Sequence, residues 1–247
     1  MMKNIRKTIA LVFFLGLLLL FLGLLPEDGK WLGWMAKIQF VPALMALNFV
    51  VIAVILIVTL IFGRLYCSII CPLGIFQDIV CRLIHKHKKF HYNKGYPLVR
   101  YAFMIAFLAF FAFGAASLVA LIDPYSMFGR WTSVDTTAGL VYNLVVVFTF
   151  VIILLFGIFC GRAYCNNICP VGTILGLFSK YSLFRFRIDK TKCNGCKACA
   201  LKCKGMCINA DDGKVDMQHC VNCFNCTGNC KQGAIKYTMR KTVKSQN

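Results

Sequence analysis

One cysteine pattern, which occurs twice near the end of the chain, constrains the fold more than any other feature. The spacing C-x2-C-x2-C-x3-C begins at Cys193 and begins again, 27 residues later, at Cys220. A short turn can direct three closely spaced thiolates at three irons of a cubane cluster, and the fourth thiolate must then come from elsewhere. The segment from Cys193 to Cys230 is therefore predicted to hold two [4Fe–4S] clusters.

The repeated pattern is the ligand set of a bacterial-type ferredoxin, in which the fourth cysteine of each run binds the cluster of the other run. We expect one cluster to be held by Cys193, Cys196, Cys199 and Cys230. We expect its neighbour to be held by Cys220, Cys223, Cys226 and Cys203. The runs depart from the usual ferredoxin at Lys204 and Lys231, which stand where proline normally follows the fourth cysteine, so the local turn is open to question.

Zinc ribbons and disulfide scaffolds also use dense cysteines. A structural zinc ion needs only four ligands, which leaves the third and fourth cysteine of each run unexplained. We therefore favour iron–sulfur clusters over zinc.

Upstream of these runs, the composition is that of a membrane protein. Hydrophobic residues make up 59% of the chain, charged residues make up 15%, and the mean hydropathy is +0.71, unlike a soluble domain. Four apolar runs, 8–25, 39–62, 98–122 and 140–160, are each long enough to cross a hydrocarbon core of about 30 Å as a helix. The first run lacks a small-residue cleavage signal, so we expect an uncleaved helix.

Loop charges predict the orientation of these spans. The N-terminus carries three Lys/Arg residues and the loop 64–97 carries six, whereas the two opposite loops carry two and one. By the positive-inside rule, both termini, the middle loop and the cysteine-rich domain are cytoplasmic, in a bacterial inner membrane. The net charge of +19 can then meet anionic lipid headgroups or an acidic partner, and it needs no nucleic acid.

A second internal repeat, at an offset of 98 residues, carries four more cysteines. The segment GRLYCSIICPLG at 63–74 recurs as GRAYCNNICPVG at 161–172. Each copy follows an even-numbered span, which indicates a duplicated two-helix unit with an axis along the membrane normal. Cysteines at i and i+4 share a helix face, and the following proline ends the helix there. We therefore expect four thiolates to meet at one cytoplasmic membrane surface: Cys67, Cys71, Cys165 and Cys169.

Four thiolates in one place suit several centres. They can hold a further iron–sulfur cluster, which we favour, or a copper or zinc ion. Transient thiol chemistry and a structural role stay open, whereas disulfides are disfavoured in a reducing cytosol.

The four spans, the two G-R-x-Y-C-x3-C-P motifs and the C-terminal double ferredoxin run together resemble the membrane polyferredoxins of the NapH type. The resemblance covers nearly the whole chain. This group includes the quinol-oxidising subunit of periplasmic nitrate reductase systems, and it shares its core with the NosR and CcoG proteins. The resemblance implies electron transfer between the quinone pool, cytoplasmic-side clusters and a partner. We expect neither the periplasmic flavin-binding domain of NosR nor the C-terminal periplasmic domain of CcoG.

Three cysteines, Cys81, Cys160 and Cys207, fall outside both sets. Cys207 aligns with Ala234 in the ferredoxin repeat, so we interpret it as a spare thiol near a cluster. Ordinary burial is enough to explain Cys160, and Cys81 in the middle loop stays unassigned.

Several polar residues have two readings. Beside the cysteine pairs, Arg64 and Arg162 either reach lipid headgroups or raise the potential of a thiolate-bound cluster. The histidines of the middle loop are read as a solvated basic loop rather than as proton acceptors for quinol: His85, His87 and His91. The outer face offers a set that suits either a quinone site or a plain polar loop: Asp123, Tyr125, Arg130 and Asp135.

The sequence thus predicts an all-α membrane domain of four transmembrane helices (1–180), a small cytoplasmic α+β ferredoxin-like domain (181–240) and a basic tail (241–247). The favoured function is electron transfer between the quinone pool and a redox partner or larger membrane complex, with quinol-dehydrogenase-like activity left open. The alternative is a maturation factor that reduces copper at the paired motifs, although the outer loops lack Met-rich or His-rich tracts. A transporter is disfavoured because the spans hold almost no ionisable residues.

Overall fold

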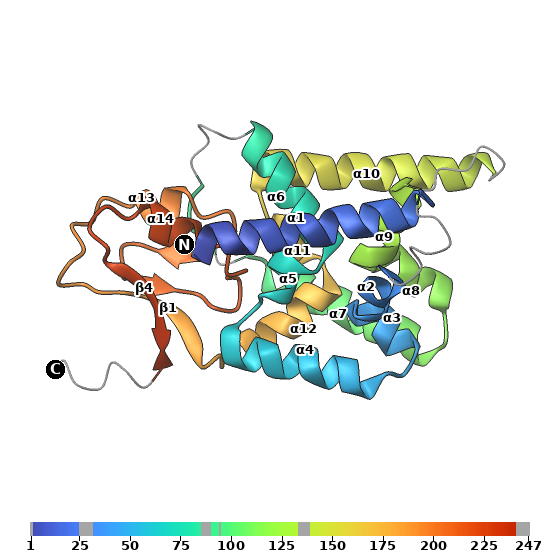
Figure 1. Ribbon diagram of the computed structural model, residues 1–247, viewed down its shortest axis with the longest axis horizontal. Helices are drawn as coiled ribbons and strands as arrows, with labels where there is room; N and C mark the ends of the chain where they lie inside the picture. The colour runs from blue at the N-terminus through green and yellow to red at the C-terminus, as the bar shows by residue number, and fades with distance from the viewer. Residues whose placement is uncertain (1, 25–31, 85–89, 94, 133–138, 241–247) are drawn as a thin grey trace.

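The computed structural model describes residues 2–24, 32–84, 90–93, 95–132 and 139–240 (Figure 1). The helical part consists of two successive units. The first contains α1 (Met2–Phe21), α2 (Trp34–Lys37), α3 (Phe40–Met45), α4 (Phe49–Phe62), α5 (Tyr66–Ile69) and α6 (Pro72–Ile84). The second contains α7 (Pro97–Ala112), α8 (Ala116–Ile122), α9 (Pro124–Thr132), α10 (Leu140–Cys160), α11 (Ala163–Asn167) and α12 (Pro170–Ser179).

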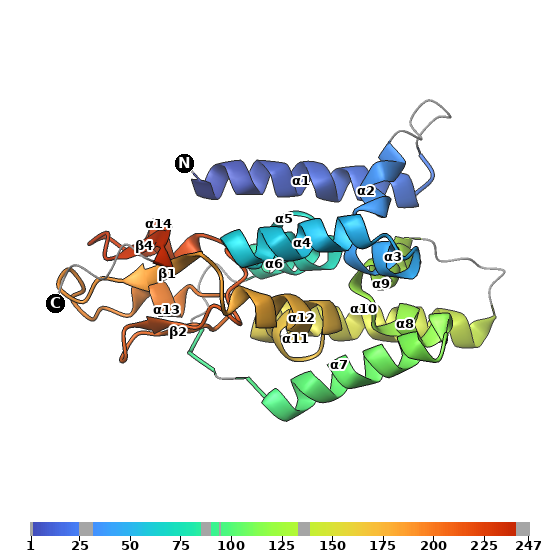
Figure 2. The same ribbon diagram turned by 90° about the horizontal axis from the view of Figure 1, so that it is seen from below.

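The two units pack crosswise. Helices α4, α5 and α6 correspond in sequence to α10, α11 and α12. The last helix of each unit packs on the long helix of the other, α6 on α10 and α12 on α4. Figure 2 shows these layers in the middle of the molecule, with α1 on one side and α7 on the other. The second cysteine motif therefore folds against the first.

Two of the four expected spans are single helices that are long and apolar enough to cross a membrane: α1 over Lys3–Phe21, and α10 over Leu140–Cys160. The expected span 39–62 is instead divided into α3 and α4, and the expected span 98–122 into α7 and α8. The mostly helical fold is therefore confirmed, whereas the expected set of four transmembrane helices stays a prediction.

The interruptions have local causes. Leu47 has a positive φ of 51°, and the side-chain oxygen of Asn48 accepts a hydrogen bond from the Val51 amide, which starts α4 anew. Between α7 and α8, Gly114 has a φ of 69°, in the left-handed region that favours glycine.

The expected middle loop 64–97 is also partly helical. It contains α5 and α6, and Pro72 is the first residue of α6, where its missing amide hydrogen costs no hydrogen bond. Cys81 lies buried on α6 rather than in a loop.

The C-terminal unit is small and mixed. Its elements are β1 (Phe184–Ile188), α13 (Ala198–Leu201), β2 (Ile208–Asn209), β3 (Lys214–Val215), α14 (Asn225–Asn229) and β4 (Ile235–Met239). Strand β1 pairs antiparallel with β4, and β2 pairs antiparallel with β3. The unit lies at one end of the long helices, on the left in Figure 1.

Hydrogen bonds fix this unit to the end of α4. The Phe62 carbonyl accepts from the Tyr237 hydroxyl at 2.7 Å and also from the Asn222 side chain. The Leu183 amide donates to the Leu60 carbonyl at 2.8 Å. Backbone carbonyls at the end of a helix lack intrahelical hydrogen-bond partners. These bonds therefore supply partners for the last carbonyls of α4 and, at the same time, hold the C-terminal unit against that helix.

Candidate iron–sulfur sites

The eight ferredoxin-type cysteines line two separate pockets. One, the outer pocket, has an empty volume of about 420 Å³, and its cysteines are Cys193, Cys196, Cys199 and Cys230. The other, the inner pocket, has an empty volume of about 330 Å³, and the expected cysteines that line it are Cys203, Cys220, Cys223 and Cys226. The fourth cysteine of each run thus lies with the first three of the other run.

The backbone repeats itself around the two pockets. Three positive-φ positions recur at the offset of 27 residues, as three pairs: Gly195 and Asn222, Lys197 and Phe224, and Met206 and Gly233. Non-glycine residues rarely adopt this conformation. The tight turns that aim three cysteines into each pocket are therefore the same in both copies. The lysines at 204 and 231 leave this geometry unchanged.

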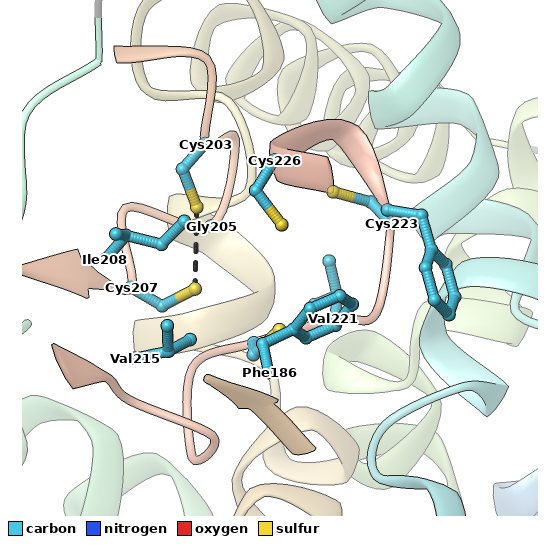
Figure 3. A pocket seen from close by; sticks show the side chains of 11 residues that line it. Phe186, Cys203, Gly205, Cys207, Ile208, Val215, Val221, Cys223 and Cys226 are labelled. Atoms are coloured by element: carbon cyan, nitrogen blue, oxygen red, sulfur yellow. Dashed lines mark hydrogen bonds between the residues drawn. The ribbon is translucent and has the colours of Figure 1, made fainter. Parts of the chain in front are cut away.

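The two pockets differ in their exposure. Cys193 and Cys196 of the outer pocket are exposed, whereas all four expected cysteines of the inner pocket are buried. The inner pocket also contains a fifth cysteine, Cys207, whose sulfur lies 3.4 Å from that of Cys203 (Figure 3). A hydrogen bond from the Cys207 thiol lowers the pKa of Cys203 to about 7, so the thiolate forms readily there.

The four C-x3-C-P cysteines meet in one buried core. Cys67, Cys71, Cys165 and Cys169 all belong to the same cluster of packed residues, and each is at most 6% exposed. The first cysteine of each pair lies on a short helix, α5 or α11. The second lies directly before α6 or α12, so each pair spans a helix break, as the prolines predicted.

Two buried arginines join the motif copies reciprocally. Arg64 donates to the carbonyl of Cys165 at 3.1 Å, and Arg162 donates to the carbonyl of Cys67 at 2.7 Å. Both side chains are 0% exposed, so neither reaches lipid headgroups. Each motif therefore supplies the arginine that holds the first cysteine of the other.

The last glycine of each motif leaves room for the arginine of the other motif. A Cβ on Gly74 would meet the Cys67 carbonyl and lie 2.8 Å from the nearest Arg162 guanidinium nitrogen. A Cβ on Gly172 would meet the Cys165 carbonyl and lie 2.8 Å from Arg64. These contacts are closer than any side chain tolerates, so the motif G-R-x-Y-C-x3-C-P-x-G is one packing unit.

A single buried carboxylate, Asp78, lies among three cations. Arg162 contacts it at 2.9 Å, Arg6 at 3.4 Å and Lys204 at 3.5 Å. Burial raises the pKa of Asp78, but Arg162, Lys204 and Arg6 outweigh burial and hold it well below its ordinary value. The ionised carboxylate thus joins α1, α6, the second motif and the C-terminal unit.

Burial also acts on the motif thiols. It raises the pKa of Cys71, Cys165 and Cys169, while Arg162 lowers the pKa of both Cys71 and Cys165. In the part of the chain that the structure describes, the cations around these thiols outnumber the acidic groups, since Arg64 forms no ion pair there and Asp78 is shared by three cations. The site therefore favours an anionic occupant.

The inner pocket adjoins the motif cysteines. Cys223 and its neighbour Val221 belong to the same packed cluster as the four motif cysteines, and both line the inner pocket. Cys199 and Cys230 of the outer pocket pack against the cluster that contains Cys203, Cys220 and Cys226. The three cysteine groups therefore form a contiguous series.

Within the described ranges, no three His, Cys, Asp or Glu side chains converge at the spacing of ligands to one metal ion. The eight ferredoxin-type cysteines surround two cavities instead. Such an arrangement fits a group of atoms with several attachment points, and the soft thiol donors are those of iron–sulfur clusters.

Other candidates from the sequence have structural partners. Asp123 caps α9, since its carboxylate accepts from the Ser126 amide at 2.9 Å. Arg130 donates to the Ala120 carbonyl. His91 is exposed, Tyr125 and Cys160 are half-buried, and His85, His87, Asp135 and the tail 241–247 lie outside the described residues.

Sequence reasoning missed Asp78, Lys204 and Gln77. The Gln77 side chain accepts from the Cys165 thiol at 3.0 Å. A polar Gln-Asp pair inside the otherwise apolar α6 was the available signal, because such residues are seldom buried without a partner. For Lys204, the replacement of the usual proline was the signal.

A family model described as a 4Fe-4S binding domain matches residues 44–91 and 142–191. Each matched segment contains one C-x3-C-P motif, and both end before Cys193. The ferredoxin-type protein NapH of Escherichia coli is 26% identical over 210 residues, which are 81% of this chain and 70% of NapH.

The chain is thus similar to NapH-type ferredoxin-like proteins. Another relative is the uncharacterized protein MJ0749 of Methanocaldococcus jannaschii, 28% identical over 74% of the chain and 68% of MJ0749. The methylamine utilization ferredoxin-type protein MauN of Paracoccus denitrificans is 29% identical over 57% of the chain and 48% of MauN. No solved structure matches it.

Proposed function

We propose that this chain is an iron–sulfur electron-transfer protein that carries electrons between a membrane quinone and a redox partner protein. The 4Fe-4S family model and the ferredoxin-type names of NapH and MauN support the iron–sulfur role. The observation that carries the proposal is the contiguous series of cysteine groups, from the motif core through Cys223 to the outer pocket.

In this proposal each group holds one cluster. The outer pocket and the inner pocket each supply four cysteines, and the motif core supplies Cys67, Cys71, Cys165 and Cys169. When bound, the clusters supply reversible one-electron carriers whose potentials depend on charge, hydrogen bonds and exposure. The third cluster is supported by the family model, which matches the segments around the motifs and not the ferredoxin run.

The buried arginines support an anionic cluster at the motif core. Four thiolates carry four negative charges, and a low-dielectric core penalises uncompensated charge of either sign. Arg64 has a buried Nε without a hydrogen-bond partner among the described residues, and its Nη2 lies 3.9 Å from the Cys67 sulfur. These cations would stabilise the additional negative charge of a reduced cluster and so raise its potential.

Exposed apolar side chains support a membrane setting for the helices. Leu98 on α7 is 83% exposed, Phe148 on α10 is 66% exposed and Val50 on α4 is 72% exposed. Apolar surface of this extent needs lipid or a partner to cover it. We infer that the C-terminal unit lies on the cytoplasmic side, where Lys192, Lys197 and Lys231 beside the outer pocket suit an acidic redox partner.

The quinone site is proposed to be a cavity between α1 and α6, with an empty volume of about 780 Å³. Its polar end is formed by Arg6, Lys7, Asp78 and Arg82, and its apolar wall includes Leu11, Ile75 and Ile79. A quinone has the same two-part chemistry, with hydrogen-bond-accepting carbonyls and an apolar tail.

The cavity is connected directly to the motif core. Ser68 lines it and follows Cys67 in the chain. Arg6, which lines it as well, is 6% exposed and donates to the Ser68 carbonyl at 3.0 Å. Its buried Nε has no hydrogen-bond partner within the described ranges. A headgroup here would satisfy that nitrogen and would lie next to the first motif cysteine.

A filling substitution tests this location. Leu11→Trp is expected to weaken binding of a short-chain menaquinone or ubiquinone analogue at least tenfold, since Leu11 lines the cavity and is 50% exposed. Leu15→Trp, one turn further along α1 and 46% exposed, is the matched control because it does not line the cavity. Equal affinities of the two variants would refute the cavity as the quinone site.

The function itself is tested under anaerobic conditions. The purified protein is reduced with dithionite, a quinone analogue is added, and the clusters are followed by low-temperature EPR. We expect rapid reoxidation that is lost in Cys67→Ser or Cys165→Ser. Intact clusters that no quinone reoxidises would refute the quinone link, and tight Cu(I) binding in place of iron at the motif cysteines would favour the copper-reducing alternative.

A further inference from the structure

Five cysteines, rather than four, line the inner pocket. Besides the expected Cys203, Cys220, Cys223 and Cys226, the pocket is lined by Cys207. Figure 3 shows the sulfur atoms of Cys203 and Cys207 pointing toward each other, and the two sulfurs lie 3.4 Å apart. Both side chains are buried, at 6% and 3% exposed. The two sulfurs therefore share one part of the pocket wall.

Comparison of the two pockets shows that the fifth cysteine has no counterpart in the outer pocket, although the backbone is alike in both. The outer pocket has Ala234 at the position of Cys207, and Ile235 at the position of Ile208. The preceding residues, Met206 and Gly233, both have a positive φ, at 50° and 60°. The backbone thus directs residue 207 into the inner pocket and residue 234 into the outer pocket, and only the inner one receives a sulfur.

We propose that Cys207 is a reserve ligand, able to take the place of Cys203 as the fourth thiolate of the inner pocket. This inference rests on the proposed function, in which the inner cysteines hold an iron–sulfur cluster. In the exchange, the bond from iron to the Cys203 sulfur breaks and one from iron to the Cys207 sulfur forms. The proton of the Cys207 thiol passes to the Cys203 sulfur, and no electron changes hands.

The residue after Cys203 is held by contacts with the helices. This residue, Lys204, donates from its side chain to the Asp78 carbonyl at 2.9 Å, and its own carbonyl accepts from the Arg162 amide at 3.1 Å. The residue that follows Cys203 is thus tied directly to the helices. A second sulfur three residues beyond Lys204 keeps four thiolates available when strain or oxidation removes Cys203.

The repeat provides a matched experiment on the full-length protein. Iron and sulfide content and the EPR spectrum are compared for Cys203→Ala and Cys230→Ala, which remove equivalent cysteines from the two pockets. Cys203→Ala is expected to keep its four-iron signal and its iron content, because Cys207 replaces the lost ligand. Cys230→Ala is expected to lose the four-iron signal of the outer pocket, because Ala234 has no thiol.

Two further variants complete the test. Cys203→Ala combined with Cys207→Ala is expected to lose the inner signal, and Cys230→Ala combined with Ala234→Cys is expected to regain the outer one. Loss of iron in Cys203→Ala as complete as in Cys230→Ala would overturn the proposal. If Cys203→Ala does not fold, the two outer-pocket variants decide. Return of the outer four-iron signal when Ala234→Cys is added to Cys230→Ala supports the proposal, and no return of that signal overturns it.

The outcomes are separable from failure of the proposed function. Parent protein without iron at the ferredoxin-type cysteines would refute the function itself. Parent protein with both four-iron signals and an empty inner pocket in Cys203→Ala would refute only the reserve ligand.

Discussion

The guanidinium of Arg162 lies 2.7 Å from the carbonyl oxygen of Cys67, across 95 residues of sequence. The same guanidinium contacts Asp78 at 2.9 Å, so one side chain holds a cysteine backbone and a buried carboxylate together. Its counterpart, Arg64, holds Cys165 but bonds to the neutral Asn166 side chain instead of a carboxylate. The two arginines therefore occupy equivalent positions in the repeat, but only Arg162 contacts a carboxylate there.

This difference predicts unequal costs of substitution. Arg162→Gln is expected to lower the free energy of unfolding by about 3–5 kcal/mol, because it leaves Asp78 buried with fewer counter-charges. Arg64→Gln is expected to cost less, about 1.5–3 kcal/mol, since it removes hydrogen bonds from a charged donor to the neutral Asn166 and Cys165 acceptors and leaves the partners of Asp78 in place. Thermal unfolding midpoints of the detergent-solubilised protein measure both, and the reverse order would contradict this account.

The motif glycines are expected to be intolerant of a methyl group. Gly172→Ala places a Cβ against the Cys165 carbonyl and Arg64, and overpacking of a close-packed core costs about 1–3 kcal/mol. Iron content at the motif cysteines is expected to fall with it. Gly33→Ala is the control, because no atom of the described residues lies within 4 Å of a Cβ there and changes away from packed contacts alter stability by about 0.5 kcal/mol or less. Equal iron content and stability in the two variants would show that the glycine is not required.

Lys204 is expected to fix the C-terminal unit to the helices. Lys204→Met removes a charged hydrogen bond to the Asp78 carbonyl, worth about 1.5–3 kcal/mol, and should increase amide exchange over residues 184–240. Lys231→Met is the matched control, since Lys231 holds the equivalent repeat position but is exposed. Similar exchange in the two variants would argue against a docking role for Lys204.

Asp78 predicts a definite pH dependence. Its pKa in the folded protein is held below that of an unfolded Asp, which is about 3.9. The stabilisation is therefore fully present above that value and is lost as the pH falls through the folded pKa. The difference in unfolding midpoint between the parent protein and Asp78→Asn should be constant between about pH 5 and pH 8 and should narrow below about pH 4. A difference that narrows above pH 5 instead would mean that the carboxylate is not held ionised.

Much of the cysteine chemistry follows from local sequence. The spacing from Cys193 to Cys230 predicted which cysteines share a pocket, because turns with two-residue gaps have few geometries. The prolines after Cys71 and Cys169 predicted the helix breaks. The repeat at 98 residues predicted that two distant pairs meet, since duplicated units pack by symmetry.

Long-range partners were beyond such reasoning. The bond from Arg64 to Cys165 spans 101 residues, and nothing in either motif alone specifies a crosswise exchange. A hydropathy window averages over Asn48, so the break between α3 and α4 was missed although Asn is a strong helix-starting residue. The same averaging classed α6 as loop.

The crosswise packing of α6 on α10 and α12 on α4 makes the motif core an interface between two halves of one chain. A protein with one copy of the motif would have to build this site as a homodimer, with both sides identical. Fusion into one chain removed that restriction. Position 78 is an aspartate that faces the α1 cavity, whereas its counterpart, Gly176, leaves room for Arg100. The two sides of the motif core are therefore no longer equivalent, because the cavity beside α1 lies on the Asp78 side.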